Sequence, residues 1–303
     1  MSEQDVSPPM VIGLGELLWD CFADSRRPGG APANVAFQAG QLGLDGAICS
    51  RVGQDALGHE LLVFLASQRL DTWWIEHDPE HPTGTVTVDT SRADHPEYTI
   101  HQNVAWDFLE CNEDWKQLAA RAAAICFGTL AQRSSVSREA IHQMLKAAGE
   151  MCLTVCDVNL RQQWFDRATV ERSLSTARAV KLNEHEVVVL AELMEAESNE
   201  PIAFARWVQQ RYQVESICIT RAERGCLLIV GEEVVDSPGV PVEVVDAVGA
   251  GDAFTAAWIF GQLQGWSPER QARFANRVGA LVASHRGAMP MLKSEFARLI
   301  AQE

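Results

Sequence analysis

The residues best suited to chemistry are concentrated in VPVEVVDAVGAGDAFTAAWIFGQL, residues 240–263. A β-type run ends at Asp246, and Gly249, Ala250 and Gly251 then turn the chain into a helix that starts near Asp252. Backbone N–H groups at a glycine-rich helix N-terminus form a site for anions, and the helix dipole strengthens it. A carboxylate in the first turn stays ionised and can accept a proton. The segment therefore predicts phosphoryl transfer to a hydroxyl group, with Asp252 as the base.

The same segment also has a purely structural interpretation. A GxGD sequence can be a turn followed by an aspartate that is favourable near the helix N-terminus. The small residues after Asp252, AFTAAWIFG, predict a helix that packs tightly on a sheet, and this context favours the chemical interpretation.

Most of the remaining sequence alternates short β-type runs with stretches of helical spacing. The β-type runs include MVIGLG (10–15), GAICSRVG (46–53), AAICFG (123–128), LTVCDVN (153–159), RAVKLN (178–183) and ESICIT (215–220). Helical spacing follows them, for example over residues 32–43 and 56–68. This alternation predicts βαβ units, and hence one α/β domain over residues 1–303 with a doubly wound, mostly parallel sheet.

One region breaks the alternation. Between Asp71 and about Gln102 the runs TWWIE, GTVTVDT and EYTIHQ follow one another without helices. With GELLWDCF they would form a small antiparallel sheet of about four strands, a lid over roughly residues 15–25 and 71–105. The apolar Trp73, Trp74 and Ile75 would cover a substrate or a second subunit, so we expect a homodimer through the lid. Packing of the two tryptophans on the main domain is the alternative.

Composition limits the partners. The net charge of −16 would repel nucleic acid, so a phosphorylated ligand must be held by local groups. The N-terminus MSEQDVSPPM has neither the basic nor the apolar region of a signal peptide, and no apolar run is long enough to span a membrane. We expect a cytoplasmic protein without membrane or nucleic-acid partners. Its eight scattered cysteines would be buried, reduced thiols.

Two segments resemble the two signatures of the ribokinase-like (PfkB) carbohydrate kinase family, and they follow one another in the order that the family has. GGAPANVAFQAGQLG (29–43) is similar to the N-terminal signature, and DAVGAGDAF (246–254) is similar to the C-terminal one. GELLWD (15–20), NVAWD (103–107), FGTLAQRS (127–134) and DVNLR (157–161) look like fructokinase segments. The resemblance implies a Rossmann-like fold with a β-sheet lid and no P-loop, and GxxxxGK[ST] is absent from the sequence.

The resemblance also implies roles for residues around an acceptor sugar. Residues 249–251 would form the anion hole beside Asp252, and the substrate-binding residues would be Asp20, Gly29, Gly30, Asn34 and Arg161. A carboxylate and an amide supply the paired acceptors and donors that sugar hydroxyls need. Structural alternatives are a solvated lid carboxylate for Asp20, a helix cap for Asn34 and an ion pair with Asp157 for Arg161.

Further roles concern the nucleotide and its ions. The resemblance implies that Asn183, Thr220, Gly225 and Asn276 bind the nucleotide. Asn183 and Glu186 share a helix face, and the pair would hold Mg²⁺ through its waters; a surface polar pair is the alternative. A monovalent cation such as K⁺ would contact Asp246 and the carbonyl of Val248. Two departures from the family pattern, Ala222 where glycine is common and Ala247 where threonine is common, affect the nucleotide site.

The function predicted on these grounds is an ATP- and Mg²⁺-dependent sugar kinase, with fructose as the leading acceptor. Alternatives are a 2-keto-3-deoxy sugar acid kinase, a nucleoside kinase or a non-catalytic sugar-binding relative. Few basic residues disfavour an acidic acceptor, although Arg26, Arg27 and Arg92 leave that question open. An NAD-linked oxidoreductase would need GxGxxG after the first strand, and GLGELL lacks the third glycine.

Overall fold

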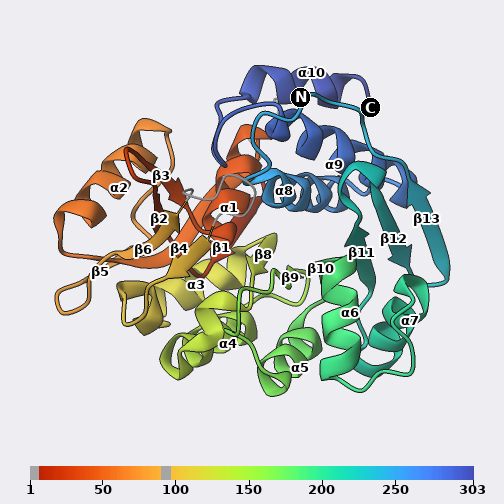
Figure 1. Ribbon diagram of the computed structural model, residues 1–303, viewed down its shortest axis with the longest axis horizontal. Coiled ribbons are helices and arrows are strands. Elements are labelled where there is room, and N and C mark those ends of the chain that lie inside the picture. The colour runs from red at the N-terminus through yellow and green to blue at the C-terminus, as the bar shows by residue number, and fades with distance from the viewer. Residues whose placement is uncertain (1–6, 90–96) are drawn as a thin grey trace, which may run out of the picture.

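A nine-stranded sheet forms the centre of the molecule (Figure 1). The computed structural model describes residues 7–89 and 97–303. The strand order is β13-β12-β11-β10-β9-β8-β1-β4-β5, and every pair from β11 to β5 is parallel. The strands are β1 (Met10–Leu14), β4 (Asp45–Gly53), β5 (Ile75–Asp78), β8 (Ala124–Phe127), β9 (Leu153–Asp157), β10 (Ala179–Asn183), β11 (Ser216–Thr220), β12 (Cys226–Val230) and β13 (Glu233–Ser237). The predicted mostly parallel α/β fold is confirmed.

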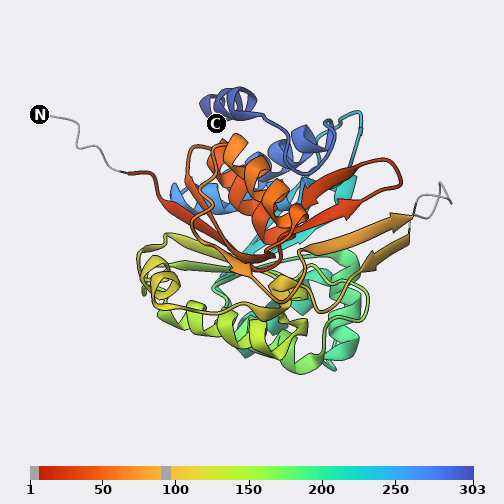
Figure 2. The same cartoon turned by 90° about the vertical axis from the view of Figure 1, so that its left-hand side faces the viewer.

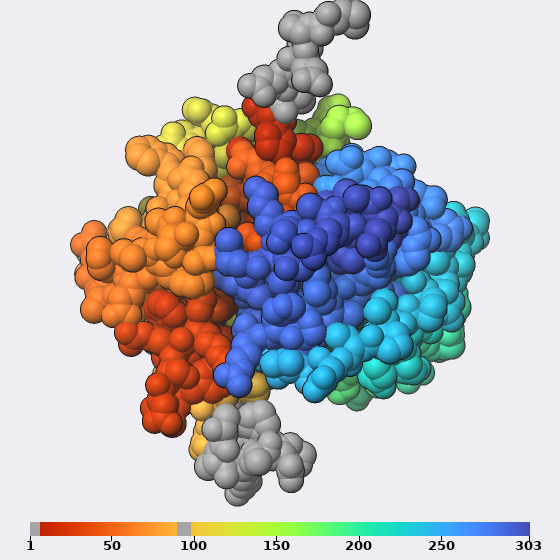
Figure 3. All heavy atoms as spheres, turned by 90° about the horizontal axis from the view of Figure 1, so that it is seen from above, coloured from red at the N-terminus to blue at the C-terminus, as the bar shows by residue number. Residues whose placement is uncertain are grey.

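Helices cover both faces of this sheet (Figure 2). On one side lie α1 (Ala31–Gln41), α2 (Ala56–Ser67), α8 (Ala250–Leu263), α9 (Pro268–Ala283) and α10 (Lys293–Ala301). On the other lie α3 (Glu113–Arg121), α4 (Ser135–Ala147), α5 (Arg167–Thr176), α6 (Glu184–Leu193) and α7 (Pro201–Tyr212). Successive strand residues point to opposite layers: Val11 joins the α8–α9 cluster, whereas Ile12 joins the cluster beneath α3–α7. From above, the orange part of the chain, which includes α1, lies beside the blue C-terminal helices (Figure 3).

The predicted small sheet is also present. It contains four strands in the order β3-β2-β6-β7 and projects from one side of the molecule (Figure 2). Its strands are β2 (Leu18–Cys21), β3 (Arg26–Gly29), β6 (Gly84–Asp89) and β7 (Glu97–Ile100). It is not purely antiparallel, because β2 pairs with β6 in parallel.

The membership of this lid differs from the prediction. The run TWWIE forms β5, which pairs in parallel with β4 after the crossover helix α2 and so belongs to the main sheet. Ile75 is buried, Trp74 packs against the core, and only Trp73 is largely exposed, at 76 %. The expected lid dimer therefore loses two of its three apolar residues to the main domain, and the homodimer remains a prediction.

In place of β5, the lid contains β3, which the sequence pattern does not reveal. SRRPGG is charged, contains a proline and shows no apolar alternation. Pro28 is tolerated because β3 lies at the edge of the lid, where a missing backbone N–H leaves no ladder bond unmade.

The predicted β-type run before the glycine-rich turn is not a strand. Residues 238–246 have no sheet partner, and the backbone N–H groups of Val245 and Asp246 both donate to the carbonyl of Ala283, at 2.9 and 3.1 Å. Pro238 and Pro241 lack the N–H groups that a sheet ladder needs. The segment is instead a partly exposed loop.

All eight cysteines are free, and all except Cys21 and Cys111 are buried, as expected for reduced thiols. Among the described residues, no helix is long and apolar enough to cross a membrane.

Candidate active site

The N-terminus of α8 follows the glycine-rich turn that the sequence analysis singled out. Gly249 precedes the helix with φ 78°, and a Cβ atom there would lie 2.5 Å from Cα of Ala288, so only glycine fits. No side chain caps the helix, which leaves N–H groups of its first turn available to a ligand. Asp252 lies in this first turn, as predicted from the GAGD sequence.

Asn34 of α1 holds the Asp252 carboxylate. Its Nδ2 donates a hydrogen bond to Asp252 Oδ2 at 2.7 Å, and α1 packs directly on α8. Asn34 is buried, and its Oδ1 atom has no hydrogen-bond partner among the residues that the structure describes. Gly30 brings the start of α1 close to the lid: its φ is 111°, and a Cβ atom there would lie 2.3 Å from the carbonyl oxygen of Glu16. Asn34 thus orients Asp252, and its contact with a sugar remains a prediction.

Two carboxyl groups, those of Glu16 and Asp20, and the guanidinium group of Arg161 lie near this hydrogen bond. Asp20 Oδ2 lies over Gly29, 2.7 Å from where a Cβ atom would stand. Burial raises the pKa of Asp20 to about 6 and that of Glu16 to about 7, and the positive charge of Arg161 opposes both shifts. Arg161 itself is exposed. The predicted substrate residues therefore gather around Asp252.

The carboxyl group of Asp252 has an unusual proton affinity. Burial and then the nearby Asp157 carboxylate raise the pKa of Asp252 to about 6. The hydrogen bond from Asn34 and the positive charges of Lys181 and Arg161 oppose this rise. A base with a pKa near 6 is ionised at neutral pH yet close enough to neutrality to take up a proton.

The structural alternative for Arg161, an ion pair with Asp157, is not formed. Asp157 is buried, and both of its oxygens lie 3.0 Å from Nζ of Lys181. The loop that carries Arg161 instead contacts the lid, because Nε2 of Gln162 donates to the carbonyl of Tyr98 at 2.5 Å. Within residues 7–89 and 97–303 the guanidinium group of Arg161 makes no ion pair and is exposed to solvent.

A cleft of about 960 Å³ adjoins the other side of the α8 N-terminus. Four predicted nucleotide residues line it, namely Asn183, Thr220, Gly225 and Asn276. Its wall also includes Ala250 and Gly251. Val240, Pro241, Val242 and Val244 add an apolar surface that the sequence analysis did not assign. The cleft thus has an apolar wall suited to a base and a helix N-terminus suited to phosphate.

The turn between β11 and β12 shapes this cleft. Gly225 has φ 87°, and a Cβ atom there would lie 2.1 Å from the carbonyl oxygen of Ser237. Ala222, where the family commonly has glycine, has φ 51° and so adopts a left-handed conformation that is unfavourable for alanine. Asn276 donates to Ser237 and Pro238, so it anchors the end of β13 while it lines the cleft.

Asn183 and Glu186 form a capping box at the start of α6. Asn183 Oδ1 accepts from the N–H of Glu186 at 2.9 Å, and Glu186 Oε2 accepts from the N–H of Asn183 at 2.7 Å. Glu186 Oε1 accepts from the N–H of Leu160 at 2.8 Å, and Glu186 is buried. The carboxylate therefore braces the loop that leads to Arg161. Its role toward Mg²⁺ remains a prediction, and residues 7–89 and 97–303 contain no His, Cys, Asp and Glu cluster able to hold a metal ion.

Asp246 is engaged by protein groups. Its Oδ2 lies 2.6 Å from Nη1 of Arg27 in the lid and 3.0 Å from the N–H of Gly287. Its Oδ1 accepts from the N–H of Val248 at 3.1 Å. The guanidinium group supplies positive charge where a monovalent cation was expected and would repel that cation. The cation-binding role of Asp246 and Val248 remains a prediction.

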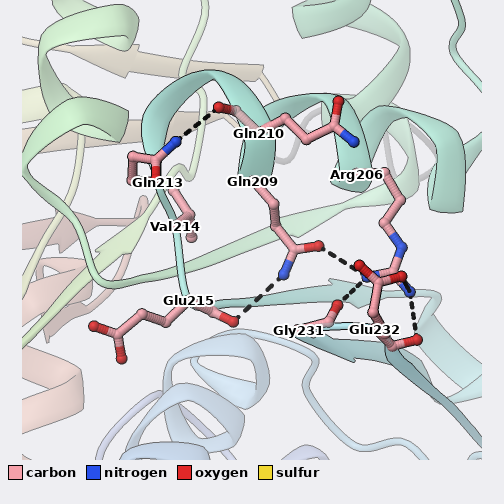
Figure 4. A pocket seen from close by; sticks show the side chains of 8 residues that line it. All are labelled: Arg206, Gln209, Gln210, Gln213, Val214, Glu215, Gly231 and Glu232. Atoms are coloured by element: carbon pink, nitrogen blue, oxygen red, sulfur yellow. Dashed lines mark hydrogen bonds and ion pairs between the residues drawn. The ribbon is translucent and has the colours of Figure 1, made fainter.

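A second hollow lies away from this site, between α7 and the β12–β13 hairpin (Figure 4). Gln209 donates to the carbonyl of Glu215, and Arg206 donates to the carbonyls of Gly231 and Glu232. These bonds tie α7 to the hairpin, so we assign the hollow a structural role.

The sequence analysis did not assign Lys181 and did not foresee the partner of Arg27. Lys181 interrupts the apolar run AVKLN. A charge inside a buried strand requires a partner, so this position could have been predicted to form a buried ion pair. Arg27 gives no such signal, since its partner Asp246 is far away in the chain.

A model of the pfkB family of carbohydrate kinases matches residues 10–295. A fructokinase of Salmonella typhimurium is 30 % identical over 298 residues, which cover 92 % of this chain and 94 % of that protein. The structure resembles that of an uncharacterised sugar kinase from Pyrococcus horikoshii, with a TM-score of 0.82, 31 % identity and coverage of 95 % and 97 %. It also resembles a Xylella fastidiosa fructokinase with bound ATP, with a TM-score of 0.86, 23 % identity and coverage of 97 % and 98 %.

Proposed function

This chain belongs to the pfkB family of carbohydrate kinases, and from that premise we propose that it phosphorylates a hydroxyl group of a neutral sugar, fructose first, at the expense of ATP. The observation that carries the proposal is the place of Asp252 between the cleft on one side and Asn34, Asp20 and Arg161 on the other. A nucleotide in the cleft would present its terminal phosphate to the first turn of α8. A sugar beneath the lid would present its hydroxyl group to Asp252.

The chemical step follows from this arrangement. The sugar oxygen attacks the γ-phosphorus, a new O–P bond forms, and the bond to the β-phosphate oxygen breaks, with its electron pair leaving on ADP. Asp252 takes the hydroxyl proton, and the N–H groups at the start of α8 face the charge on the transferred group. Mg²⁺, when bound, supplies further neutralisation of phosphate charge.

A neutral acceptor is favoured because most basic side chains near the lid already have acidic partners. Arg26 pairs with Glu60, and Arg27 pairs with Asp246. Arg133 pairs with Asp107 at 2.8 Å. Arg92 lies outside the described residues. The carboxyl groups of Glu16, Asp20 and Asp252 would repel an anionic acceptor once they are ionised.

A 2-keto-3-deoxy sugar acid is the second candidate. Arg161 is exposed and makes no ion pair in the described part of the chain, so its guanidinium group could bind a carboxylate. A nucleoside is the third candidate. Retention of Asp252 and Gly249 disfavours a non-catalytic relative.

A coupled ADP-release assay tests the proposal directly. The purified protein would be supplied with ATP, Mg²⁺ and, in turn, fructose, other neutral sugars, a 2-keto-3-deoxy sugar acid and a nucleoside. We expect the highest kcat/KM with a neutral sugar. Faster turnover of the sugar acid would instead assign Arg161 to its carboxylate, and no turnover of any acceptor would contradict the proposed function.

A further inference from the structure

A buried lysine lies beneath the helix that carries Asp252. Lys181 belongs to β10, is only 8 % exposed, and places Nζ 3.0 Å from each carboxylate oxygen of Asp157 on the adjacent strand β9. A buried ion pair is costly to form, since both charges lose their hydration. The proposed reaction does not use Lys181 as base or ligand, so its presence needs another explanation.

The ion pair is connected to the first turn of α8. Oγ1 of Thr255 lies 2.8 Å from Asp157 Oδ2 and 3.0 Å from the carbonyl oxygen of Gly251, and its single proton can be donated to either. Lys181 Nζ lies 3.4 Å from where a Cβ atom of Gly251 would stand. The ammonium group is therefore in contact range of the backbone that forms the anion site.

Several charged groups face Asp252 from different elements. They are Asp157 from β9, Lys181 from β10, Arg161 from the loop after β9, and Glu16 and Asp20 from the segment that leads into the lid. Negative charges outnumber positive ones in this set. Of the two positive groups, Arg161 is exposed and Lys181 is buried.

We propose that Lys181 is a positioning residue: held by Asp157, it fixes the first turn of α8 through Thr255 and Gly251, and its charge balances the carboxylates of Asp157 and Asp252. The inference rests on the proposed function, because the charge of Lys181 matters for catalysis only if Asp252 accepts the hydroxyl proton. Without the ammonium group, two neighbouring buried carboxylates would repel one another.

The charge state of Lys181 supports this role. Burial alone would lower the pKa of Lys181, but the carboxylates of Asp157, Glu186 and Asp252 outweigh burial and raise it. Lys181 therefore remains an ammonium ion across the working pH range.

The two members of the ion pair should act on Asp252 in opposite directions. In Lys181→Met, a compensating positive charge is lost, and the titration midpoint of Asp252 should rise by about one pH unit. In Asp157→Asn, a repelling negative charge is lost, and the midpoint should fall by about one pH unit. General loosening of the structure does not produce shifts of opposite sign.

The experiment follows the Asp252 carboxyl ¹³C signal against pH in the full-length protein, with the signal assigned from its absence in Asp252→Asn. Lys116→Met is the matched control, because Lys116 lies on the surface of α3 and pairs with exposed Glu113, and it should leave the midpoint unchanged. Opposite shifts in the two variants support the proposal, and midpoints that stay fixed or move together overturn it. If Lys181→Met does not fold, Lys181→Gln takes its place, and a midpoint that does not rise in that variant overturns the proposal.

The titration needs no substrate, so it is independent of the proposed function. A wild-type protein that turns over no acceptor would contradict the function while the Asp252 midpoints still test Lys181. Where activity is present, the acidic limb of the kcat profile should follow the same opposite shifts, with the sugar KM changed less than about threefold.

Discussion

Nδ2 of Asn34 and Oδ2 of Asp252 are hydrogen-bonded at 2.7 Å, although 218 positions separate the two residues in the chain. One belongs to GGAPAN and the other to GAGD, the two most recognisable motifs of the sequence. Their packing on adjacent helices α1 and α8 brings both motifs to one carboxylate. Asn34 thereby fixes which oxygen of Asp252 remains free for a substrate.

Loss of this hydrogen bond should change the pH dependence of activity. The pKa of Asp252 is raised to about 6 by burial and by Asp157, and Asn34 opposes the rise. Because the base must be ionised, wild-type kcat should fall as pH drops through about 6. In Asn34→Ala the acidic limb should move upward and kcat should fall by ~10-fold or more at neutral pH. Asn199→Ala, at an exposed position, is the control, and an unmoved limb in Asn34→Ala would refute the assigned role.

Glu16 should make folding stability depend on pH. Burial raises its pKa from 4.5 to about 7, so the folded state binds a proton that the unfolded state releases between these values. The stabilisation is present below the unfolded pKa and is lost as pH rises through about 7. The melting temperature of Glu16→Gln should therefore be higher than that of the wild type near pH 8 and close to it near pH 4. Thermal unfolding at both pH values measures this, and an equal difference at both would contradict it.

Glu186→Gln should separate bracing from metal binding. Glutamine can accept only one of the two backbone N–H bonds that Glu186 accepts from Asn183 and Leu160, so stability should fall by about 1–3 kcal/mol. If the carboxylate also orders Mg²⁺-bound waters, the Mg²⁺ concentration for half-maximal activity should rise as well, and we expect both effects. Glu192→Gln, exposed on the same helix, is the control. If stability falls but the Mg²⁺ concentration for half-maximal activity is unchanged, Glu186 has a structural role and does not contribute to Mg²⁺ binding.

Trp74→Glu should destabilise the monomer without dissociating an oligomer. Trp74 packs against the main core, its carbonyl accepts from Nε1 of Trp115, and Arg121 lies 5.8 Å from its ring centroid. Replacing this half-buried indole ring by a carboxylate loses its packing and should cost about 2 kcal/mol. Light scattering should give the same mass for the variant as for the wild type. A dimeric wild type that becomes monomeric on this substitution would restore the idea of a dimer contact at this segment.

The main sheet was predictable because its strands are apolar runs followed by helical spacing, as in MVIGLG and AAICFG. The lid was predicted as a sheet, but β5 was wrongly included in it. The sequence TWWIE does not indicate which sheet edge it joins, and pairing with β4 is decided by the α2 crossover. Conversely, β3 was missed because a lid-edge strand needs neither apolar alternation nor a full set of N–H groups.

The predicted site residues differ in how far sequence could place them. Asp252 and Gly249 are local features, since a turn and a helix N-terminus are encoded by neighbouring residues. The ion pair of Arg27 with Asp246 and the engagement of Asn276 by the end of β13 depend on contacts between distant segments. Such contacts follow from the packing of layers and carry no local pattern.

The central claim is that Asp252 is the base of a sugar kinase. Asp252→Asn keeps the volume of the side chain and preserves an oxygen that can face Asn34. The decisive measurement is kcat of the purified variant with its best acceptor, together with the sugar dissociation constant from calorimetry. The account predicts that kcat falls by at least ~10², while sugar affinity changes less than about threefold. Near-normal kcat in a folded Asp252→Asn protein would contradict it.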